Sequence, residues 1–243
     1  MIHIYSIQYN KPMFIELQKK SFDKFIKEYS FTVIDNSIDE EISNKIKEIC
    51  KLNELNCIET ENKFDSRTNG LHGFSHEVGL NCFLDKLKNT HKNTDIVMLL
   101  DHDVFLVSDI SKILDIISES SILTLKQQRE HIYYVWPGLT IFNLKNCVNI
   151  NEISLDGAKL INGGWVPIDK GVFTDVGGHS YHYLKKYENQ LKFINLNEHF
   201  VNEIVEQINN NHVFFHFHAG SQWSGYSNEV WHNKFEQIKK IIE

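Results

Sequence analysis

Short apolar runs separated by amphipathic stretches mark the first half of the chain. The runs Ile2–Gln8, Phe31–Ile34 and Cys57–Glu61 have the length of strands, and apolar residues between them recur at helical spacing. Further helices are expected over about 77–87 and 110–117. This order of strands and helices is typical of an α/β fold built on a parallel sheet.

One apolar run is followed directly by two carboxylates. Ile96–Leu100 is continuously apolar, which favours a strand buried on both faces, and Asp101 and Asp103 come straight after it. A buried unpaired carboxylate is costly, so both acids must lie where the strand leaves the core. Ligands bind at this edge of an open α/β sheet. Residues at i and i+2 of an extended chain face the same way, and a hard divalent cation is the natural partner of two such oxygen ligands.

The second half of the chain is less regular. Ile122–Leu125 and Leu139–Phe142 are expected strands, and Tyr133–Gly138 between them is expected as an aromatic turn. Two later strands are expected at Leu191–Leu196 and Val213–His218. The sequence has no internal repeat and no clear linker, so a single domain is expected.

Composition and charge narrow the possible partners. The 243 residues carry a formal net charge of −7, which gives no sign of a nucleic-acid partner. The four cysteines form no C-x-x-C pair and are typical of free thiols in a reducing compartment. We find no transmembrane segment, and the N-terminus lacks the basic region of a signal peptide, so a cytoplasmic protein is expected, in the host cytoplasm if viral.

The triplet Asp101-His102-Asp103, behind an apolar strand and preceded by strand–helix units, resembles the D-x-D glycosyltransferases of the GT-A fold. This resemblance implies a Rossmann-like mixed central sheet with helices on both faces. It also implies transfer of a sugar from a nucleotide diphosphate sugar, with UDP as the favoured nucleotide, to an acceptor hydroxyl in glycan synthesis. The single domain 1–243 would then divide into a donor-binding half, 1–107, and an acceptor-side half, 108–243.

The resemblance implies a Mn²⁺ or Mg²⁺ ion at the acid pair. Asp103 would ligate the metal directly, and Asp101 would contact the ribose or the metal. The late His218 resembles the C-terminal metal-ligand histidine of the family, and imidazole is a good metal ligand. His216 and His218 alternate with phenylalanines and share one face, so one is expected to coordinate and the other to lie in the core. His218 is preferred because it ends the strand and leads into Gly220.

Donor contacts follow from the same resemblance, each with a structural alternative. Asp35 would bind the base or cap a helix, and His72 and His76 would lie over the donor or on the surface. Asn81 would touch the donor or serve only the helix. Ser221 and Trp223 belong to a Gly- and Ser-rich loop that is either a lid excluding water or a plain surface loop. The implied donor contacts are Gln8, Asp35, His72, Gly73, Asn81, His102, Ser221 and Trp223.

The acceptor side offers a candidate base. Asp175 precedes Gly177-Gly178 and an expected helix, similar to the acid pair of inverting family members, although this chain has Asp-Val where they have Glu-Asp. A helix cap is the alternative role of Asp175, Asp156 and Asp169 are weaker candidates, and a retaining enzyme would need no base. Aromatic faces stack on sugars but also pack at the edges of cores. The candidate acceptor platform consists of Trp136, Gly138, Gly164 and Trp165.

Two other functions fit parts of the pattern. A haloacid-dehalogenase-like phosphatase also ends an apolar strand in D-x-D, but on its first strand and with Thr or Val two residues later. Here three strands precede the motif and Phe105 occupies that position, which disfavours a phosphohydrolase. A non-catalytic protein that binds nucleotide sugars or glycans would keep the same pocket.

Overall fold

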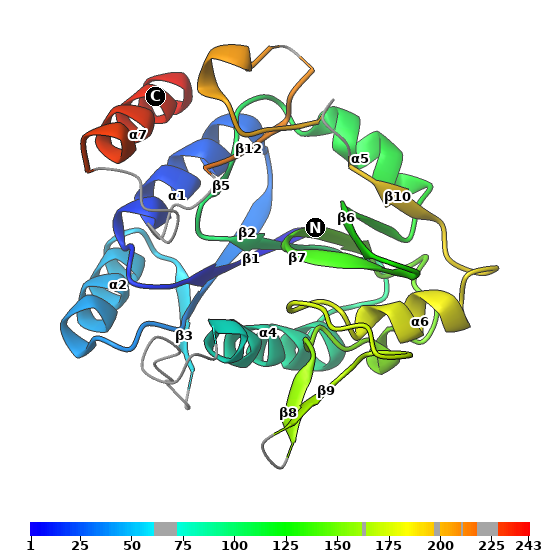
Figure 1. Ribbon diagram of the computed structural model, residues 1–243. Coiled ribbons are helices and arrows are strands. Elements are labelled where there is room, and N and C mark those ends of the chain that lie inside the picture. Colours follow the sequence, from blue (N-terminus) through cyan, green and yellow to red (C-terminus); the bar gives the residue numbers. More distant parts are fainter. Residues whose placement is uncertain (61–71, 162–163, 197–199, 210, 218–227) are drawn as a thin grey trace.

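The computed structural model describes all residues except 61–71, 162–163, 197–199, 210 and 218–227 (Figure 1). Residues 72–75, 159–161, 164–165 and 206 are described by their backbone alone. The helices and strands, in chain order, are β1 (Ile2–Gln8), α1 (Met13–Phe25), β2 (Tyr29–Asp35), α2 (Glu40–Leu52), β3 (Asn56–Glu59), α4 (His72–Asn89), β4 (Ile96–Asp101), β5 (Val104–Leu106), α5 (Ser111–Ser118), β6 (Ile122–Arg129), β7 (Ile132–Asn143), β8 (Lys159–Ile161), β9 (Gly164–Val166), α6 (Ser180–Lys186), β10 (Phe193–Asn195), β11 (Val201–Asn202), β12 (Phe214–His216) and α7 (Asn228–Ile242). Two 3₁₀ turns cover Ile150–Glu152 and Val205–Gln207.

A mixed seven-stranded sheet forms the centre of the fold, in the order β10-β6-β7-β4-β1-β2-β3. The four neighbouring strands β4, β1, β2 and β3 run parallel to one another. Strand β7 runs antiparallel to both β4 and β6. Helices α1 and α5 cover one face of the sheet, and α4 and α6 cover the other (Figure 1). The expected α/β fold with a mixed central sheet and helices on both faces is confirmed.

The parallel strands β1, β2 and β4 end at one edge of the sheet. Their register pairs Ile7 with Asp101 and Gln8 with Asp35. The strand interiors are mostly apolar and buried, as a sheet covered on both faces requires, with Ser6 and Thr32 as buried polar exceptions. The side chains of Gln8, Asp35 and Asp101 occur together, at the carboxyl ends of neighbouring strands.

A small second sheet brings the C-terminal part of the chain to the same edge. Strand β12 lies between β11 and β5, and it pairs antiparallel with β5 so that His216 lies opposite Val104. The backbone N–H of Phe217 donates to the carbonyl of Asp103, with 2.8 Å between N and O. Phe14 of α1 and Trp231 of α7 pack against this sheet. The chain is thus anchored beside the acid pair one residue before position 218.

The expectation of a turn over Tyr133–Gly138 is wrong, because this segment belongs to the long strand β7. The chain reverses instead at Glu130, which has a left-handed φ of +51°. Pairing between β6 and β7 is irregular just after Thr124, and the Thr124 hydroxyl accepts from the backbone N–H of Trp136 at 3.1 Å. Pro137 carries no N–H and lies in this interrupted part of the ladder, where a strand tolerates it.

Within the described residues, the helices are too short or too polar for any of them to span a bilayer. The four cysteines are free thiols. Burial raises the pKa of Cys147 to about 12.

Candidate active site

Asp101 ends β4 and faces His76 of α4. The His76 Nε2 lies 3.0 Å from the Asp101 Oδ1. Burial alone would lower the pKa of His76, but the carboxylates of Asp101 and Asp103 outweigh it and raise this pKa above its usual value. The charge of Asp175 also raises the pKa of His76, so Asp175 belongs to the same electrostatic environment as the acid pair. Burial alone would raise the pKa of Asp101, but the neighbouring His76 outweighs burial and holds this pKa below its usual range.

Asp103 lies two residues further on and is buried, with 6% of its surface exposed. The His216 Nε2 is 3.8 Å from the Asp103 Oδ1, and the His216 Nδ1 is 2.8 Å from the Glu203 Oε1. Burial would lower the pKa of His216, but Glu203 and the acid pair raise it. Two imidazoles, one from α4 and one from β12, therefore lie at the two carboxylates.

Two buried glutamines hold the turn that carries the acids. The Gln18 amide of α1 donates to the carbonyls of Asp101 and Val104, at 2.9 and 3.0 Å. The Gln8 amide donates to the Gln18 side-chain oxygen at 3.0 Å and to Ser6. Among the described residues the Gln8 Oε1 has no hydrogen-bond partner. Gln8 thus supports the acid pair from inside, and its contact with a donor stays a prediction.

His102, between the two acids, points toward the core. Its ring stacks on Phe14 with 5.5 Å between centroids, and 8% of the residue is exposed. Its Nε2 is buried without a hydrogen-bond partner among the described residues. The ring therefore anchors the turn on α1, and a direct contact with the donor stays a prediction.

Asp35 is fully buried at the end of β2. Its Oδ1 accepts from the backbone N–H of Ser37 at 2.9 Å, and its Oδ2 accepts from the Ser43 hydroxyl. The N-cap of α2 is instead Asp39, whose side chain accepts from the N–H of Ile42 at 3.1 Å. Asp35 therefore orders the β2–α2 turn without capping the helix, and recognition of a base by this turn stays a prediction.

Helix α4 runs behind the acid pair and is longer than the expected 77–87. Gly79 allows close packing on β1, since a Cβ there would lie 2.8 Å from the Ile7 side chain. Asn81 is exposed, whereas His76 reaches Asp101. His72 and Gly73 form the first turn of the helix and are described by backbone alone. Donor contacts at Asn81, His72 and Gly73 stay predictions.

Trp136 lies beside the site on β7. Its ring is half-buried and packs edge-on against His216, with 4.8 Å between centroids. A Cβ at Gly138 would come within 2.3 Å of the Trp136 ring, so only glycine fits beneath it. This contact joins the aromatic segment of β7 to the histidine next to Asp103, and use of the ring as an acceptor platform stays a prediction.

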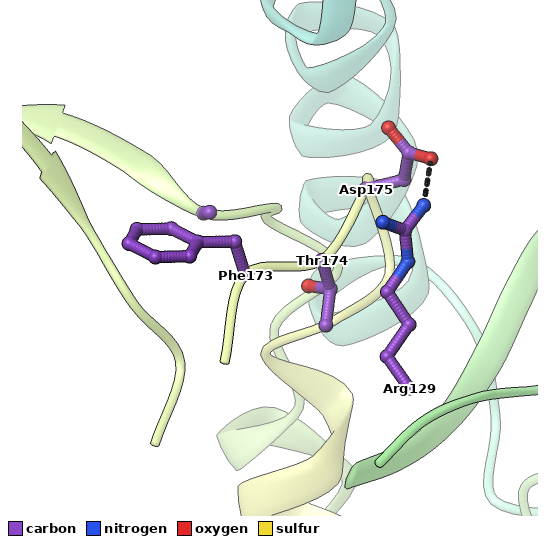
Figure 2. A pocket seen from close by; sticks show the side chains of 5 residues that line it. Arg129, Phe173, Thr174 and Asp175 are labelled. Carbon is purple, nitrogen blue, oxygen red and sulfur yellow. Dashed lines mark hydrogen bonds and ion pairs between the residues drawn. The ribbon is translucent and has the colours of Figure 1, made fainter. Parts of the chain in front are cut away.

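Asp175 lies at a separate pocket of about 300 Å³, lined by Arg129, Ala158, Phe173, Thr174 and Asp175 (Figure 2). Its Oδ2 is 3.0 Å from an Arg129 guanidinium nitrogen. Gly177 has a φ of +91°, and a Cβ there would collide with the Val135 carbonyl, so this turn packs closely on β7.

The N-cap of α6 is His179, so Asp175 is not the cap that its sequence position also allowed. Asp169 instead pairs with His131 at 3.1 Å, and the Asp156 carbonyl accepts from the N–H of His179. Only Asp175 of these three acids lines the pocket. Its role as a base stays a prediction.

The structure describes the remaining predicted residues by their backbone alone or not at all. Gly164 and Trp165 belong to β9, which pairs antiparallel with β8, and only their backbone is described. His218, Ser221 and Trp223 lie outside the described residues.

Sequence reasoning missed several residues that contact the predicted ones. Gln18 shows no signal beyond a polar side chain on an amphipathic helix. Glu203 lies in an irregular segment, and only the pairing of β11 with β12 brings it to His216. His76 was expected, like His72 one helical turn before it, to lie over the donor or on the surface, and its contact with Asp101 was not predicted.

Comparison with solved structures shows which known fold the chain has. The chain matches no protein-family model and no curated protein sequence. Among solved structures, the galactosyltransferase LgtC, solved with donor and acceptor sugar analogs, has a TM-score of 0.54 at 11% identity, over 100% of this chain and 95% of LgtC. GlyE from Streptococcus pneumoniae TIGR4 has a TM-score of 0.53 at 13% identity, over 99% of this chain and 61% of GlyE. Mouse xyloside xylosyltransferase 1 has a TM-score of 0.51 at 11% identity, over 90% of this chain and 98% of that protein.

At these identities the likeness establishes the architecture. All three structures are glycosyltransferases, and the match to LgtC extends over the whole chain, including the C-terminal part that β12 anchors beside the acid pair. The expected fold is therefore confirmed, and this chain has the GT-A glycosyltransferase fold.

Proposed function

We propose that the chain is a metal-dependent glycosyltransferase that moves a sugar from a nucleotide diphosphate sugar to an acceptor hydroxyl. The observation that carries this proposal is the pair Asp101 and Asp103 at the carboxyl end of β4, on a fold shared with glycosyltransferases. Ligands of open α/β sheets bind at this edge. A UDP-sugar is the donor that the sequence resemblance favours.

The acid pair is the proposed metal site. Asp103 would ligate Mn²⁺ or Mg²⁺ directly, with Asp101 on the metal or the donor ribose and His218 as a further ligand. The donor set fits, because carboxylate oxygens are the ligands that hard divalent cations prefer. When bound, such a cation neutralises the charge of the departing diphosphate.

The C-terminal segment is the proposed cover of the donor. Phe217 is hydrogen-bonded to the Asp103 carbonyl, and it directly precedes His218 in the sequence. This contact supports His218 as a ligand. Ser221 and Trp223 follow a few residues later and would close over the diphosphate, excluding the water that would otherwise hydrolyse the donor.

The pocket at Asp175 is the proposed acceptor site. An inverting transfer needs a carboxylate that takes the proton of the attacking hydroxyl. The ion pair with Arg129 orients the Asp175 carboxylate at the pocket (Figure 2). Phe173 is 45% exposed there and offers a flat apolar face to a sugar ring. Trp136 would extend this platform toward His216.

A turnover assay tests the proposal against a non-catalytic binder. The purified chain with Mn²⁺ would be incubated with a panel of UDP-sugars and mixed saccharide acceptors, and release of UDP and glycosylated product would be measured by mass spectrometry. We expect product from at least one donor and none when Mn²⁺ is chelated. Donor binding without any UDP release or product across the panel would contradict transferase activity.

A further inference from the structure

Three metal-binding side chains converge at the opposite end of the central sheet. His3 comes from the start of β1, His91 from the loop after α4, and Asp95 from the residue before β4. The ligand atoms of all three lie within 4.8 Å of one another. The Asp95 Oδ2 is 3.4 Å from the His3 Nε2 and 3.7 Å from the His91 Nδ1. None of these residues belongs to the proposed catalytic site.

Both imidazoles are held from behind by hydroxyl groups. The His3 Nδ1 is 2.7 Å from the Ser30 Oγ, and the His91 Nε2 is 2.8 Å from the Tyr5 phenol oxygen. In each ring the hydrogen-bonded nitrogen is therefore the one that points away from Asp95. Metal-binding histidines are oriented in this way, with one nitrogen on the ion and the other bonded to a second group.

The carboxylate is fixed as firmly as the rings. The backbone N–H of Lys92 donates to the Asp95 Oδ2 at 2.9 Å, and the N–H of Asp95 donates back to the Lys92 carbonyl at 3.0 Å. Asp95 is 8% exposed, and the His91 side chain is 4% exposed. The cluster is thus a built and largely enclosed site, and it does not depend on flexible surface side chains.

The spacing matches a tetrahedral transition-metal ion. Ligands about 2.0–2.1 Å from a tetrahedral Zn²⁺ lie about 3.3–3.4 Å from one another. The two distances to the Asp95 Oδ2 are near this value, and the ligand nitrogens of the two imidazoles lie within 4.8 Å of one another, so the rings would move inward on binding an ion. Two imidazoles and one carboxylate suit Zn²⁺ better than Mn²⁺ or Mg²⁺, which prefer oxygen. The partly exposed His3 leaves a side open for a water as fourth ligand.

We propose that His3, His91 and Asp95 form a Zn²⁺ site, separate from the acid pair at the carboxyl edge. Asp95 directly precedes β4 and Asp101 ends it, so the two lie six residues apart, which is about 20 Å at the usual rise of a β-strand. The ion would tie the α4–β4 loop to the start of β1. Its effect is on the stability of the fold, and no chemical step of the transfer passes through it.

Cobalt binding tests this site optically, because Co²⁺ replaces Zn²⁺ and shows intense visible bands when it is four-coordinate. The titration would use the full chain carrying Asp103→Asn, so that the acid pair contributes little. We expect one four-coordinate Co²⁺ per chain, displaced by Zn²⁺, with affinity at least about tenfold lower in His91→Gln and in Asp95→Asn. The matched control is His232→Gln on the exposed face of α7, which we expect to bind as the parent does.

The variants separate loss of ligands from loss of fold. Asp95→Asn keeps an oxygen that accepts from the Lys92 N–H, so we expect this variant to fold. If circular dichroism shows that His91→Gln is unfolded, the Co²⁺ affinity of Asp95→Asn alone tests the site. Absence of a four-coordinate spectrum in the parent, or unchanged affinity in folded His91→Gln or Asp95→Asn, would overturn the proposal. Turnover with UDP-sugars is not part of this readout, so failure of the proposed catalytic function leaves the result interpretable.

Discussion

Strand β4 has a carboxylate and histidines at both ends, and the two ends are built differently. At its start, Asp95, His3 and His91 lie within 4.8 Å of one another, and hydroxyls or backbone groups hold each of them. At its end, Asp101 and Asp103 face imidazoles on different elements. Within the described part of the chain, only the first end gathers three potential ligands that closely.

This difference separates a closed site from an open one. The closed end gathers three protein ligands with room for one water, so it can bind an ion and stabilise the fold but leaves little room for a substrate. Acids that are spread over a strand end and a turn leave coordination positions for phosphate oxygens. We therefore propose donor binding at the carboxyl end of β4 and a structural ion at its amino end.

The largest effect is expected at the pocket of Asp175, the proposed acceptor site. Asp175→Asn removes the proposed base but keeps the shape of the side chain, so kcat should fall by about 10²–10⁴-fold while donor affinity is unchanged. Steady-state kinetics and calorimetry of UDP binding measure the two quantities. The matched control is Asp169→Asn, which pairs with His131 outside the pocket and should keep kcat. An unchanged kcat in Asp175→Asn would remove it as the base.

Loss of the imidazole behind Asp101 should have the next largest effect. His76→Gln removes the partner that orients the carboxylate, so the Mn²⁺-dependent affinity for UDP should fall by about 10–100-fold. Calorimetry with and without Mn²⁺ measures it, and His232→Gln serves as the exposed control. An unchanged Mn²⁺-dependent affinity for UDP in folded His76→Gln would contradict this role of His76.

Packing beneath Trp136 should matter to a smaller extent. Gly138→Ala places a methyl group 2.3 Å from the Trp136 ring and displaces this ring from His216. Overpacking of this kind costs about 1–3 kcal/mol of unfolding free energy. Urea unfolding measures the loss, and a raised KM for the acceptor would accompany it if the ring belongs to the platform. Gly171→Ala is the control for a glycine whose Cβ would contact nothing, although its φ of +83° adds some strain.

The smallest effect is expected at the closed end. Asp95→Asn weakens its interaction with two histidines and should cost about 1 kcal/mol of stability without Zn²⁺. In the parent chain, Zn²⁺ at about 100 times its dissociation constant should raise Tm by about 5–11 °C, and the variant should lose this rise. The kcat with a UDP-sugar and Mn²⁺ should be the same for both. A fall in kcat together with the fall in stability would show that the two ends of β4 are coupled.

The sequence predicts the open end of β4 better than the closed end. The acid pair follows an apolar run, and the cost of burying a carboxylate places both acids at the strand terminus, as the structure confirms for β4. The histidines are harder to predict, because His76 and His216 reach the acids only through the packing of α4 and the pairing of β12 with β5. The turn expected over Tyr133–Gly138 was wrong for a related reason. Its aromatic residues and Pro137 resemble a turn locally, but pairing with β6 extends the strand through them.

The cluster at the closed end gives no local signal. His3, His91 and Asp95 are brought together by the parallel pairing of β1 with β4 and by the loop that follows α4. A single histidine near the start of a strand does not indicate a metal ligand, because its partners lie about 90 residues away in the sequence. Sites of this kind follow from the tertiary fold, and a strand-by-strand reading of the sequence does not find them.

Manganese-dependent binding of UDP tests the central claim most directly. Calorimetric titrations would compare the parent chain with Asp103→Asn, each with and without Mn²⁺. We expect Mn²⁺ to increase the affinity of the parent for UDP by at least about tenfold and to have no effect on Asp103→Asn. Equal affinities in all four titrations would contradict a cation-dependent diphosphate site at the end of β4.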